Sequence, residues 1–405
     1  MEDKKQERLR EIQEDILEEL DLSRSVGDEE LMDMIHHTLG QHCVKEYLSL
    51  QEKAALGKEL FNSFRKLDIL QELIEDEEIT EIMINGPETI FLERHGELFP
   101  ADRHFLSKEK LEDVIQQIVS GCNRIVNEAS PIVDARLPDG SRVNVVLAPI
   151  ALNGPAVTIR KFPKQATTME QLTAWGAIDS ETAAFLARLV EARYNIFISG
   201  GTGSGKTTFL NALSEFIPKT ERLITIEDNA ELRIHGAVNL VRLETRNANV
   251  EGQGAITMED LFRSALRMRP NRIIVGEVRG KEAFSMIEAM SSGHPGSMST
   301  GHANSPRDML MRLETMILMG MEMPLTAIQR KIASGVDIIV HLSRYRDQSR
   351  RVAEIVEVLD VADGEIQVHK LYEFVENGMK NGMICGKLVK KGEIKQKEKL
   401  LAAGY

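Results

Sequence analysis

Cysteine is scarce in this chain of 405 residues, and its scarcity limits the kinds of site that the protein can contain. The three cysteines, Cys43, Cys122 and Cys385, stand far apart, and none belongs to a C-x-x-C pair. An odd number of widely spaced cysteines favours reduced thiols in a cytosol. We therefore expect neither a disulfide framework nor a cysteine-bound zinc ion.

Long apolar runs are missing as well. No stretch approaches the roughly 18 uninterrupted apolar residues of a membrane-spanning helix, and the opening letters MEDKKQE contain no apolar core of a secretory signal. Aromatic residues make up 5% of the chain and the formal net charge is −13, which disfavours nucleic acid as a partner. We expect a cytoplasmic protein without direct membrane insertion.

The patterning of the chain predicts four segments, because its length is too great for one compact core. Residues 1–60 have helical periodicity and favour a small helical module, with a coiled arm as the alternative. Residues 61–163 combine strand alternation with turn signals, which predicts an α+β domain with an antiparallel sheet. Residues 164–372 alternate strands and helices as in a parallel α/β sheet. Residues 163–168 are expected to be a linker, and residues 373–405 a solvated tail.

The most informative segment is residues 200–207, which read GGTGSGKT and match the phosphate-binding pattern G-x-x-x-x-G-K-[ST]. A short apolar strand is predicted before the segment and a helix after it, which is the context that such a loop requires. Backbone N–H groups and the positive end of the helix dipole then converge on polyphosphate. Lys206 is expected to reach the β- and γ-phosphates of ATP, and Thr207 to hold Mg²⁺. The predicted ATP-binding residues are Gly201, Thr202, Gly203, Ser204, Gly205, Lys206, Thr207 and Thr208.

Hydrolysis needs a group that positions the attacking water and a group that binds the metal. Carboxylates that follow two later apolar strands are candidates for both roles. Glu227 and Asp228 end one strand, and either carboxylate is a candidate for orienting the attacking water; capping a following helix is the alternative. Glu277 ends the other strand and is expected to hold Mg²⁺ through water, although Gly276 occupies the place where an aspartate is usual. Ligands of open α/β sheets bind at this carboxyl edge.

Two histidines, His294 and His302, flank a further predicted strand. A histidine at a strand end can hydrogen-bond a phosphate and respond to its presence. Taken alone, two histidines at this spacing are more often structural.

The segments just described resemble, in order and spacing, the motifs of the secretion ATPases. Glu227-Asp228, the letters GEVRG at residues 276–280 and the histidine segment at residues 292–304 resemble the Asp box, Walker B motif and His box of that family. Its members are the hexameric motors of type II secretion, type IV pili and type IV secretion. The letters RLPDGSRVN at residues 136–144 and TIRKF at residues 158–162 are most similar to the CpaF branch, which drives assembly of tight-adherence (Flp) pili.

The resemblance implies that residues 164–372 form a RecA-like P-loop domain and that the protein assembles as a homo-hexamer. It also implies that ATP with Mg²⁺ is held between this domain and the α+β domain before it, and that arginines of the preceding domain contact the γ-phosphate. By their place in the motif, Arg142 and Arg160 are the candidates, with Arg136 behind them; ordinary surface arginines are the alternative.

The same resemblance assigns roles around the loop. The family's catalytic glutamate falls on Glu227 and its Walker B acid on Glu277. Phosphate sensing falls on His294, His302 and Arg279, of which Arg279 is expected to tie the nucleotide site to the neighbouring strands.

Because we expect no spanning segment or lipid anchor, we expect an inner-membrane platform protein to recruit the chain to the inner face of the plasma membrane. The helices expected from Glu7 to Leu50 lie outside the shared motor core and are the candidate for part of the adaptor surface. Within the family, a DNA-transfer or pilus-retraction ATPase is the alternative. A nucleic-acid motor and a non-hydrolysing scaffold are rivals of other classes.

Three departures from the family pattern are visible. The tetracysteine zinc module of many extension ATPases is missing, Asn271 stands where aspartate is frequent, and Gly301 replaces a bulky apolar residue. We expect Gly301 to loosen the His box.

Overall fold

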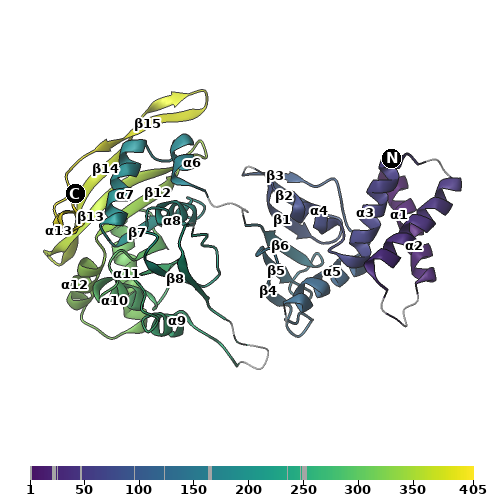
Figure 1. Ribbon diagram of the computed structural model, residues 1–405, viewed down its shortest axis with the longest axis horizontal. Helices are drawn as coiled ribbons and strands as arrows, with labels where there is room; N and C mark the ends of the chain where they lie inside the picture. The colour runs from purple at the N-terminus through teal and green to yellow at the C-terminus, as the bar shows by residue number, and fades with distance from the viewer. Residues whose placement is uncertain are drawn as a thin grey trace. The chain divides into compact units, whose positions relative to one another are not determined.

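The chain forms two compact units, Met1–Lys164 and Gln165–Tyr405, which are drawn in Figure 1. This computed structural model describes residues 2–20, 24, 26–45, 48–94, 96–122, 124–162, 167–234, 236–246, 248 and 253–405. Most of the linker expected at residues 163–168 lies outside the described residues. In the described part of the chain, no helix is both long and apolar enough to cross a membrane.

Three helices make up the helical module: α1 (Glu2–Glu19), α2 (Asp28–Lys45) and α3 (Leu50–Arg65). Their apolar stripes share one small core, formed by Ile12, Ile16, Val26, Leu31, Ile35, Leu39, Leu48, Leu56 and Leu60. α3 begins with a capping box between Ser49 and Glu52, which satisfies the first free N–H groups of the helix. Because α3 continues to Arg65, the module extends beyond the residue 60 that was expected.

An antiparallel sheet with two helices follows the module, as the sequence predicts. Its strands are β1 (Ile79–Asn85), β2 (Ile90–Arg94), β3 (Glu97–Pro100), β4 (Ile132–Arg136), β5 (Arg142–Val146) and β6 (Ala156–Arg160), in the order β3-β2-β1-β6-β5-β4. The helices are α4 (Ile69–Glu75) and α5 (Lys108–Gly121). Ser107 caps α5 by accepting a hydrogen bond from the N–H of Lys110. This arrangement confirms the α+β part of the predicted fold class.

The second unit is built on a nine-stranded sheet, covered by helices on both faces (Figure 1). Its strands are β7 (Ile196–Gly200), β8 (Arg222–Glu227), β9 (Asn239–Glu244), β10 (Arg272–Val275), β11 (Met298–His302), β12 (Ile338–Arg344), β13 (Arg350–Ala362), β14 (Glu365–Lys380) and β15 (Met383–Lys390). Its helices are α6 (Met169–Ala174), α7 (Ser180–Glu191), α8 (Lys206–Ser214), α9 (Met258–Ala265), α10 (Ala283–Ser291), α11 (Pro306–Gly320), α12 (Leu325–Gly335) and α13 (Glu398–Ala403).

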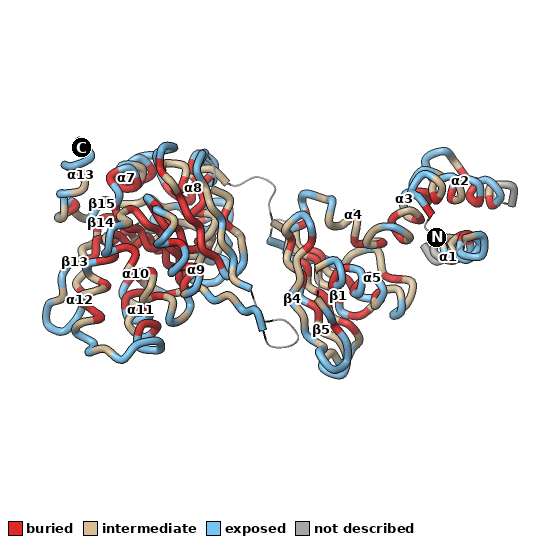
Figure 2. The backbone as a smooth tube through the Cα atoms, turned by 60° about the horizontal axis from the view of Figure 1, so that its bottom comes forward, coloured by how far each residue is buried: buried red, intermediate tan, exposed pale blue. Residues whose placement is uncertain are grey.

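Parallel pairing places β7 inside the sheet, whose strand order is β15-β14-β13-β12-β7-β11-β10-β8-β9. The strands from β12 to β9 in this order are parallel to their neighbours, and β13, β14 and β15 are antiparallel additions. Alternate residues of β7 enter different cores: Ile196 and Ile198 pack with α6, α7 and α8, whereas Phe197 packs with α9 to α12. Buried residues accordingly run through the middle of this unit in Figure 2. The parallel α/β prediction is confirmed.

The C-terminal segment differs from the solvated tail that was expected for residues 373–405. β14 continues to Lys380, β15 returns along it, and α13 lies against α7. Leu388 and Leu400 pack on the core that contains β7, which the lysine-rich composition of the segment conceals. The lysines face outward while a few apolar residues attach the segment to the sheet.

A buried ion pair joins two strand starts at the edge of the sheet opposite the phosphate loop. Arg272, whose side chain is 0% exposed, donates from Nε and Nη2 to the Glu221 carboxylate at 2.5 and 3.2 Å, and from Nη1 to the Val190 carbonyl at 2.7 Å. Arg193 contacts the same carboxylate at 3.0 Å but is 44% exposed. The buried carboxylate of Glu221 is therefore compensated mainly by Arg272.

We predict that Arg272→Gln lowers the free energy of unfolding by about 3–5 kcal/mol, because it leaves the buried Glu221 charge without its main partner. The matched variant Arg193→Gln removes a solvent-screened contact to the same carboxylate and should cost less than about 1 kcal/mol. Urea unfolding of the full-length protein measures both. Equal losses in the two variants would contradict the assignment of the stability to Arg272.

Candidate functional site

The predicted catalytic residues of the second unit gather at one edge of its sheet, because parallel strands end on the same side. The phosphate loop follows β7, Glu227 ends β8, Glu277 comes two residues after β10, and His302 ends β11. The register places His302 directly beside Gly200, the last residue of β7.

The phosphate loop turns sharply from β7 into α8. Gly203 and Gly205 have φ values of 71° and 92°, a left-handed conformation that favours glycine. Lys206 opens α8, is 7% exposed and donates from Nζ to the carbonyls of Gly200 at 3.1 Å and Gly201 at 2.9 Å. Burial lowers the pKa of Lys206. The eight predicted ATP-binding residues therefore form the loop and the first turn of α8, a helix that begins at Gly205 without a side-chain cap and so can offer its first N–H groups to an anion.

A chain of contacts links Lys206 to the end of β10. Lys206 Nζ lies 3.2 Å from His302 Nδ1, His302 Nε2 lies 2.8 Å from Glu277 Oε1, and Arg279 Nη2 donates to Glu277 Oε2 at 2.8 Å. Burial lowers the pKa of His302 and favours the neutral ring, which accepts from Lys206 at Nδ1 and carries its proton at Nε2. The structure thus brings together four of the residues that the sequence singled out.

Glu227 is the most buried carboxylate at this edge, with 1% of its surface exposed. Its Oε2 accepts from the backbone N–H groups of Glu231 at 2.6 Å and Leu232 at 2.7 Å. Its Oε1 has no hydrogen-bond partner among the residues that the structure describes. Burial raises the pKa of Glu227 to about 7, against the lowering effect of the two N–H donors. A carboxylate with this pKa exchanges a proton near neutral pH, as a water-activating group requires.

Gly276 accounts for the close approach of the β8 and β10 ends. A Cβ on Gly276 would lie 3.1 Å from Glu227 Cγ, a distance at which the glutamate would have to shift. The absence of the usual aspartate therefore gives Glu227 its space. The other acidic candidate, Asp228, is exposed and accepts a hydrogen bond from the Thr245 hydroxyl at 2.7 Å.

His294 is not brought to the phosphate loop of its own unit. It precedes β11, and its Nδ1 lies 3.2 Å from the Pro270 carbonyl at the start of β10. Four or more residues of extended strand, roughly 13 Å or longer, separate the two ends of β11. Within its own unit, His294 therefore lies at the far end of β11 from the loop and His302 lies beside the loop, and phosphate sensing stays a prediction for both.

A model of the family described as "Type II/IV secretion system protein" matches residues 64–392. The chain belongs to this family. It is 35% identical over 305 residues to a Mycobacterium tuberculosis protein named for conjugal transfer, Rv3659c, across 74% of this chain and 86% of that protein. It is 33% identical over 315 residues to the type IV secretion system protein PtlH of Bordetella pertussis, across 71% of this chain and 93% of that protein.

The fold is shared with the crystal structure of the pilus retraction motor PilT with bound ADP. The TM-score is 0.52 at 18% identity, across 81% of this chain and 83% of that chain. The RecA-like architecture predicted for this secretion-family chain is therefore confirmed, and membership of the CpaF branch stays a prediction.

Two departures from the family pattern have local explanations. A Cβ on Gly301 would lie 2.9 Å from Met309 Sδ and 3.0 Å from Phe197 Cε1, so large neighbours fill the space above this glycine. The expected loosening of the His box is therefore wrong. Asn271 exchanges hydrogen bonds with the backbone of Arg222, accepting at Oδ1 from its N–H at 2.7 Å, and so aligns β10 with β8.

The predicted γ-phosphate arginines lie in the first unit, in one row across its sheet. Arg136 pairs with Arg142, and Arg142 pairs with Arg160 in the strand registers. Directly paired residues of antiparallel strands point to the same face, and Glu81 of β1 ends the row beside Arg160. Three guanidinium groups on one face suit an anion, and the contact with ATP stays a prediction.

Sequence reasoning missed a buried pair under the phosphate loop. Ser199 Oγ lies 2.8 Å from His341 Nδ1, where β12 runs beside β7. Burial lowers the pKa of His341, so the ring is neutral and can share one hydrogen with the hydroxyl. A histidine inside the apolar strand at residues 337–342 was the available signal.

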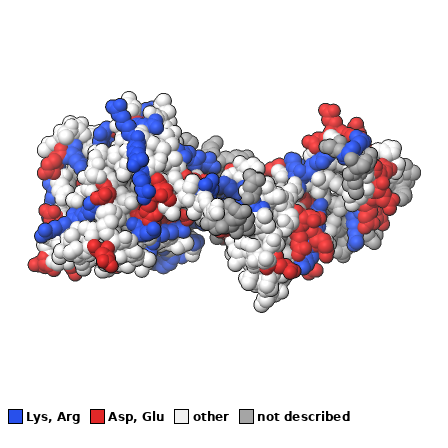
Figure 3. Space-filling view, turned by 90° about the horizontal axis from the view of Figure 1, so that it is seen from below, with Lys and Arg blue, Asp and Glu red and all other residues white. Residues whose placement is uncertain are grey.

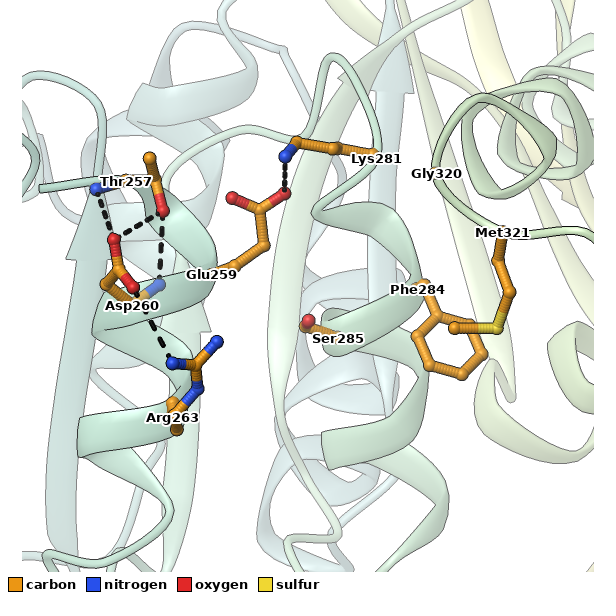
Figure 4. Close-up of a pocket in the computed structure, with 9 residues that line it drawn as sticks. All are labelled: Thr257, Glu259, Asp260, Arg263, Lys281, Phe284, Ser285, Gly320 and Met321. Atoms are coloured by element: carbon orange, nitrogen blue, oxygen red, sulfur yellow. Dashed lines mark hydrogen bonds and ion pairs between the residues drawn. The ribbon is translucent and has the colours of Figure 1, made fainter.

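A pocket of about 420 Å³ lies elsewhere, between α9, α10 and the end of α11 (Figure 4). Its charged side chains are paired with one another: Lys281 with Glu259 at 3.1 Å, and Arg263 with Asp260 at 3.9 Å. None of the predicted nucleotide-binding residues lines it. The pocket is therefore separate from the predicted nucleotide site at the sheet edge.

The raised pKa of Glu227 predicts a pH-dependent stability. Between 4.5, the ordinary pKa of this carboxyl, and about 7, the folded protein keeps a proton that the unfolded chain has released. Stability contributed by the neutral carboxyl is therefore present below pH 4.5 and is lost as the pH rises to about 7, by about 3 kcal/mol in total. Glu227→Gln should abolish this loss, so that the variant gains stability relative to wild type from pH 5 to pH 8.

Urea unfolding of full-length wild type and variant at several pH values measures the difference. Asp228→Asn, which changes an exposed carboxylate, is the matched control and should show no such divergence. A constant difference between wild type and Glu227→Gln across this range would contradict the assignment.

Proposed function

We propose that the protein is a Mg²⁺-dependent ATPase that hydrolyses ATP to ADP and phosphate for a secretion or pilus-assembly machine. The observation that carries this proposal is the position of Glu227, a buried carboxylate with an unpartnered oxygen, at the same sheet edge as the phosphate loop and Lys206.

The donor set at this edge fits Mg²⁺. Magnesium prefers oxygen ligands and keeps several waters, and the Thr207 hydroxyl and the Glu277 carboxylate would hold it, the carboxylate through water. The ion would neutralise charge on the phosphate oxygens. A carboxylate already paired with Arg279 and close to His302 is held in place for that contact.

In the proposed reaction, Lys206 leaves the loop carbonyls and pairs with the phosphates. Glu227 orients the attacking water and accepts its proton, while the backbone N–H groups of the loop stabilise the developing charge. His302 contacts both Lys206 and Glu277, so it senses the phosphate through either partner. Most of the rate enhancement then comes from positioning and electrostatics.

We further propose a homo-hexamer in which Arg142 and Arg160 complete the nucleotide site, with Arg136 behind them. The row of guanidinium groups on one sheet face supports this role. Domain closure on ATP would then provide the work stroke.

The machine that we propose is the assembly apparatus of Flp-type pili or a related type II-like system, on the similarity of residues 136–144 and 158–162 to the CpaF branch. A second candidate is a DNA-transfer or other type IV secretion ATPase, which the names of the relatives in Mycobacterium tuberculosis and Bordetella pertussis favour. Prepilin and prepilin-peptidase genes beside the gene for this protein would favour the pilus-assembly apparatus over the type IV secretion ATPase.

Two substitutions separate nucleotide binding from turnover. Lys206→Ala should weaken ATP binding, because the loop loses its buried ammonium group. Glu227→Gln should bind ATP nearly as wild type does and turn over ~10²–10⁴-fold more slowly, since only the proton acceptor is lost. Nucleotide titration and single-turnover phosphate release measure the two steps.

Asp228→Asn is the control for these variants and should hydrolyse ATP at close to the wild-type rate, because Thr245 already engages its side chain. Wild-type turnover by Glu227→Gln together with an inactive Asp228→Asn would transfer the role to Asp228.

The helical module is our candidate for the adaptor to an inner-membrane platform protein, which would recruit the ATPase to the membrane. Residues 1–63 precede the family match, so the module is an addition to the shared motor. Acidic side chains gather on the face of the module seen at the right of Figure 3. On α1, Glu11, Glu14 and Glu18 are exposed, opposite buried Ile12 and Ile16. Basic cytoplasmic loops of a platform protein would complement this face.

Removing residues 1–48 should leave ATP hydrolysis within about twofold of wild type and abolish assembly in cells, since α3 keeps its Ser49 cap. Reversing the charge of Glu11, Glu14 and Glu18 to lysine should have the same effect without exposing the module core. Hydrolysis assays and counts of assembled pili or secreted cargo measure the two readouts. Normal assembly by both variants would place docking on another surface.

A further inference from the structure

The hairpin of β12 and β13 extends over the phosphate loop. Leu342 of β12 pairs with Gly200, the last residue of β7, so β12 continues for two residues beyond the point where β7 turns into the loop. The last of these residues, Arg344, pairs across the hairpin with Arg350 of β13. The strand register alone therefore places two arginines beyond the end of β7.

Both arginines lie against glycines of the loop. The position that a Cβ would take on Gly203 is 3.9 Å from Arg344 Nη1, and the corresponding position on Gly205 is 3.7 Å from Arg350 Cδ. These two glycines belong to the loop whose N–H groups are expected to surround the phosphates. The guanidinium groups are therefore within side-chain reach of a bound polyphosphate.

The four arginines of this hairpin differ in their partners. Arg346 donates to the Glu376 carboxylate at 2.9 Å, and Arg351 lies 3.7 Å from Asp347 and donates to the Ile384 carbonyl at 2.8 Å. No acidic side chain in the described segments forms an ion pair with Arg344 or Arg350. Arg346 and Arg351 are therefore compensated by acidic partners, whereas the two arginines beside the loop have no acidic partner among the described residues.

The hairpin tip is held firmly enough to position these side chains. Asp347 accepts from the N–H groups of Ser349 at 3.0 Å and Ile384 at 2.7 Å, which attaches the tip to β15. The N–H of Tyr345 donates to the Ser349 carbonyl at 2.8 Å and closes the turn. A preorganised tip loses little conformational entropy when a ligand binds.

We propose that Arg344 and Arg350 bind the phosphates of the nucleotide held by the loop, as two cations from the same subunit. This inference rests on the proposed ATPase function and adds residues that the family motifs do not name. Arginine presents a planar fork of donors that matches phosphate oxygens. Lys206 and His302 lie on the β11 side of β7 and the arginines on the β12 side, so the phosphates are contacted from both sides.

The loop that these arginines approach holds the phosphates that ADP and ATP have in common. Arg344→Gln and Arg350→Gln should therefore each weaken ADP and a non-hydrolysable ATP analogue to a similar degree, by roughly tenfold, and the double variant should lose more than either. Raising the ionic strength should weaken binding by wild type more than by the double variant, since fewer charges remain to be screened.

Titration of Mg²⁺-ADP and the ATP analogue into the full-length protein measures these affinities. Arg346→Gln is the matched control, because it removes an arginine of the same hairpin that is already paired with Glu376, and it should bind as wild type does. Lysine at both positions should restore part of the affinity. Thermal melting of each variant verifies that the fold is retained.

Nucleotide binding by these proteins distinguishes a failure of the proposed ATPase function from a failure of the role of the two arginines. Wild type that binds no nucleotide overturns the proposed ATPase function. Wild type and Arg346→Gln that bind ADP, together with a folded double variant of equal affinity, overturn the role of the two arginines. Unchanged ADP affinity with altered assembly of the double variant would assign them instead to an acidic surface of another subunit.

Discussion

The site depends on the parallel register of the strands around β7. Because β8, β10, β11 and β12 run in the same direction as β7, their carboxyl ends reach one edge, where the loop begins. Each end delivers a different group: a buried acid from β8, a second acid after β10, a histidine from β11 and an arginine from β12. A shift of one residue in any pairing would turn the delivered side chain to the other face of the sheet.

The opposite edge of the sheet maintains that register. The buried pair of Arg272 and Glu221 and the backbone contacts of Asn271 tie the start of β10 to the start of β8. Asn195 does the same for β7, because its Oδ1 accepts from the N–H of Gly296 at 2.8 Å and its Nδ2 donates to the Gly335 carbonyl at 2.7 Å. The interactions that hold the strands in register thus lie at one edge of the sheet, and the strands connect them to the candidate catalytic residues at the other edge.

Small residues determine how closely the catalytic groups approach one another. Gly276 admits Glu227 to the end of β10, and Gly301 admits Phe197 and Met309 to the back of the His box. Gly276 stands where a Walker B strand usually ends in aspartate and Gly301 where the family usually has a bulky apolar residue, and in both positions a neighbouring side chain fills the space. Both glycines are therefore matched by packing, and the residues predicted to contact phosphate remain at the same sheet edge.

Much of the site was predictable from the sequence because its signals are local. The loop, the strand that precedes it and the helix that follows are contiguous, and the acids after β8 and β10 follow apolar runs of strand length. The antiparallel sheet of the first unit was predictable from alternation and from the Pro-Asp-Gly turn between β4 and β5. His294 precedes its strand, and in a parallel sheet that position lies at the edge away from the loop, whereas His302 at the strand end lies at the loop edge.

The sequence by itself determined the phosphate loop, the carboxylates and the two kinds of sheet, since each depends on neighbours along the chain. Only the tertiary structure decided that the lysine-rich C-terminal segment would pack as β15 and α13, because a few apolar residues outweigh many solvated charges. It also decided which arginines of the β12–β13 hairpin are paired and which lie beside the loop. Strand pairing joins residues about 140 positions apart, such as Gly200 and Leu342, and no local pattern encodes that contact.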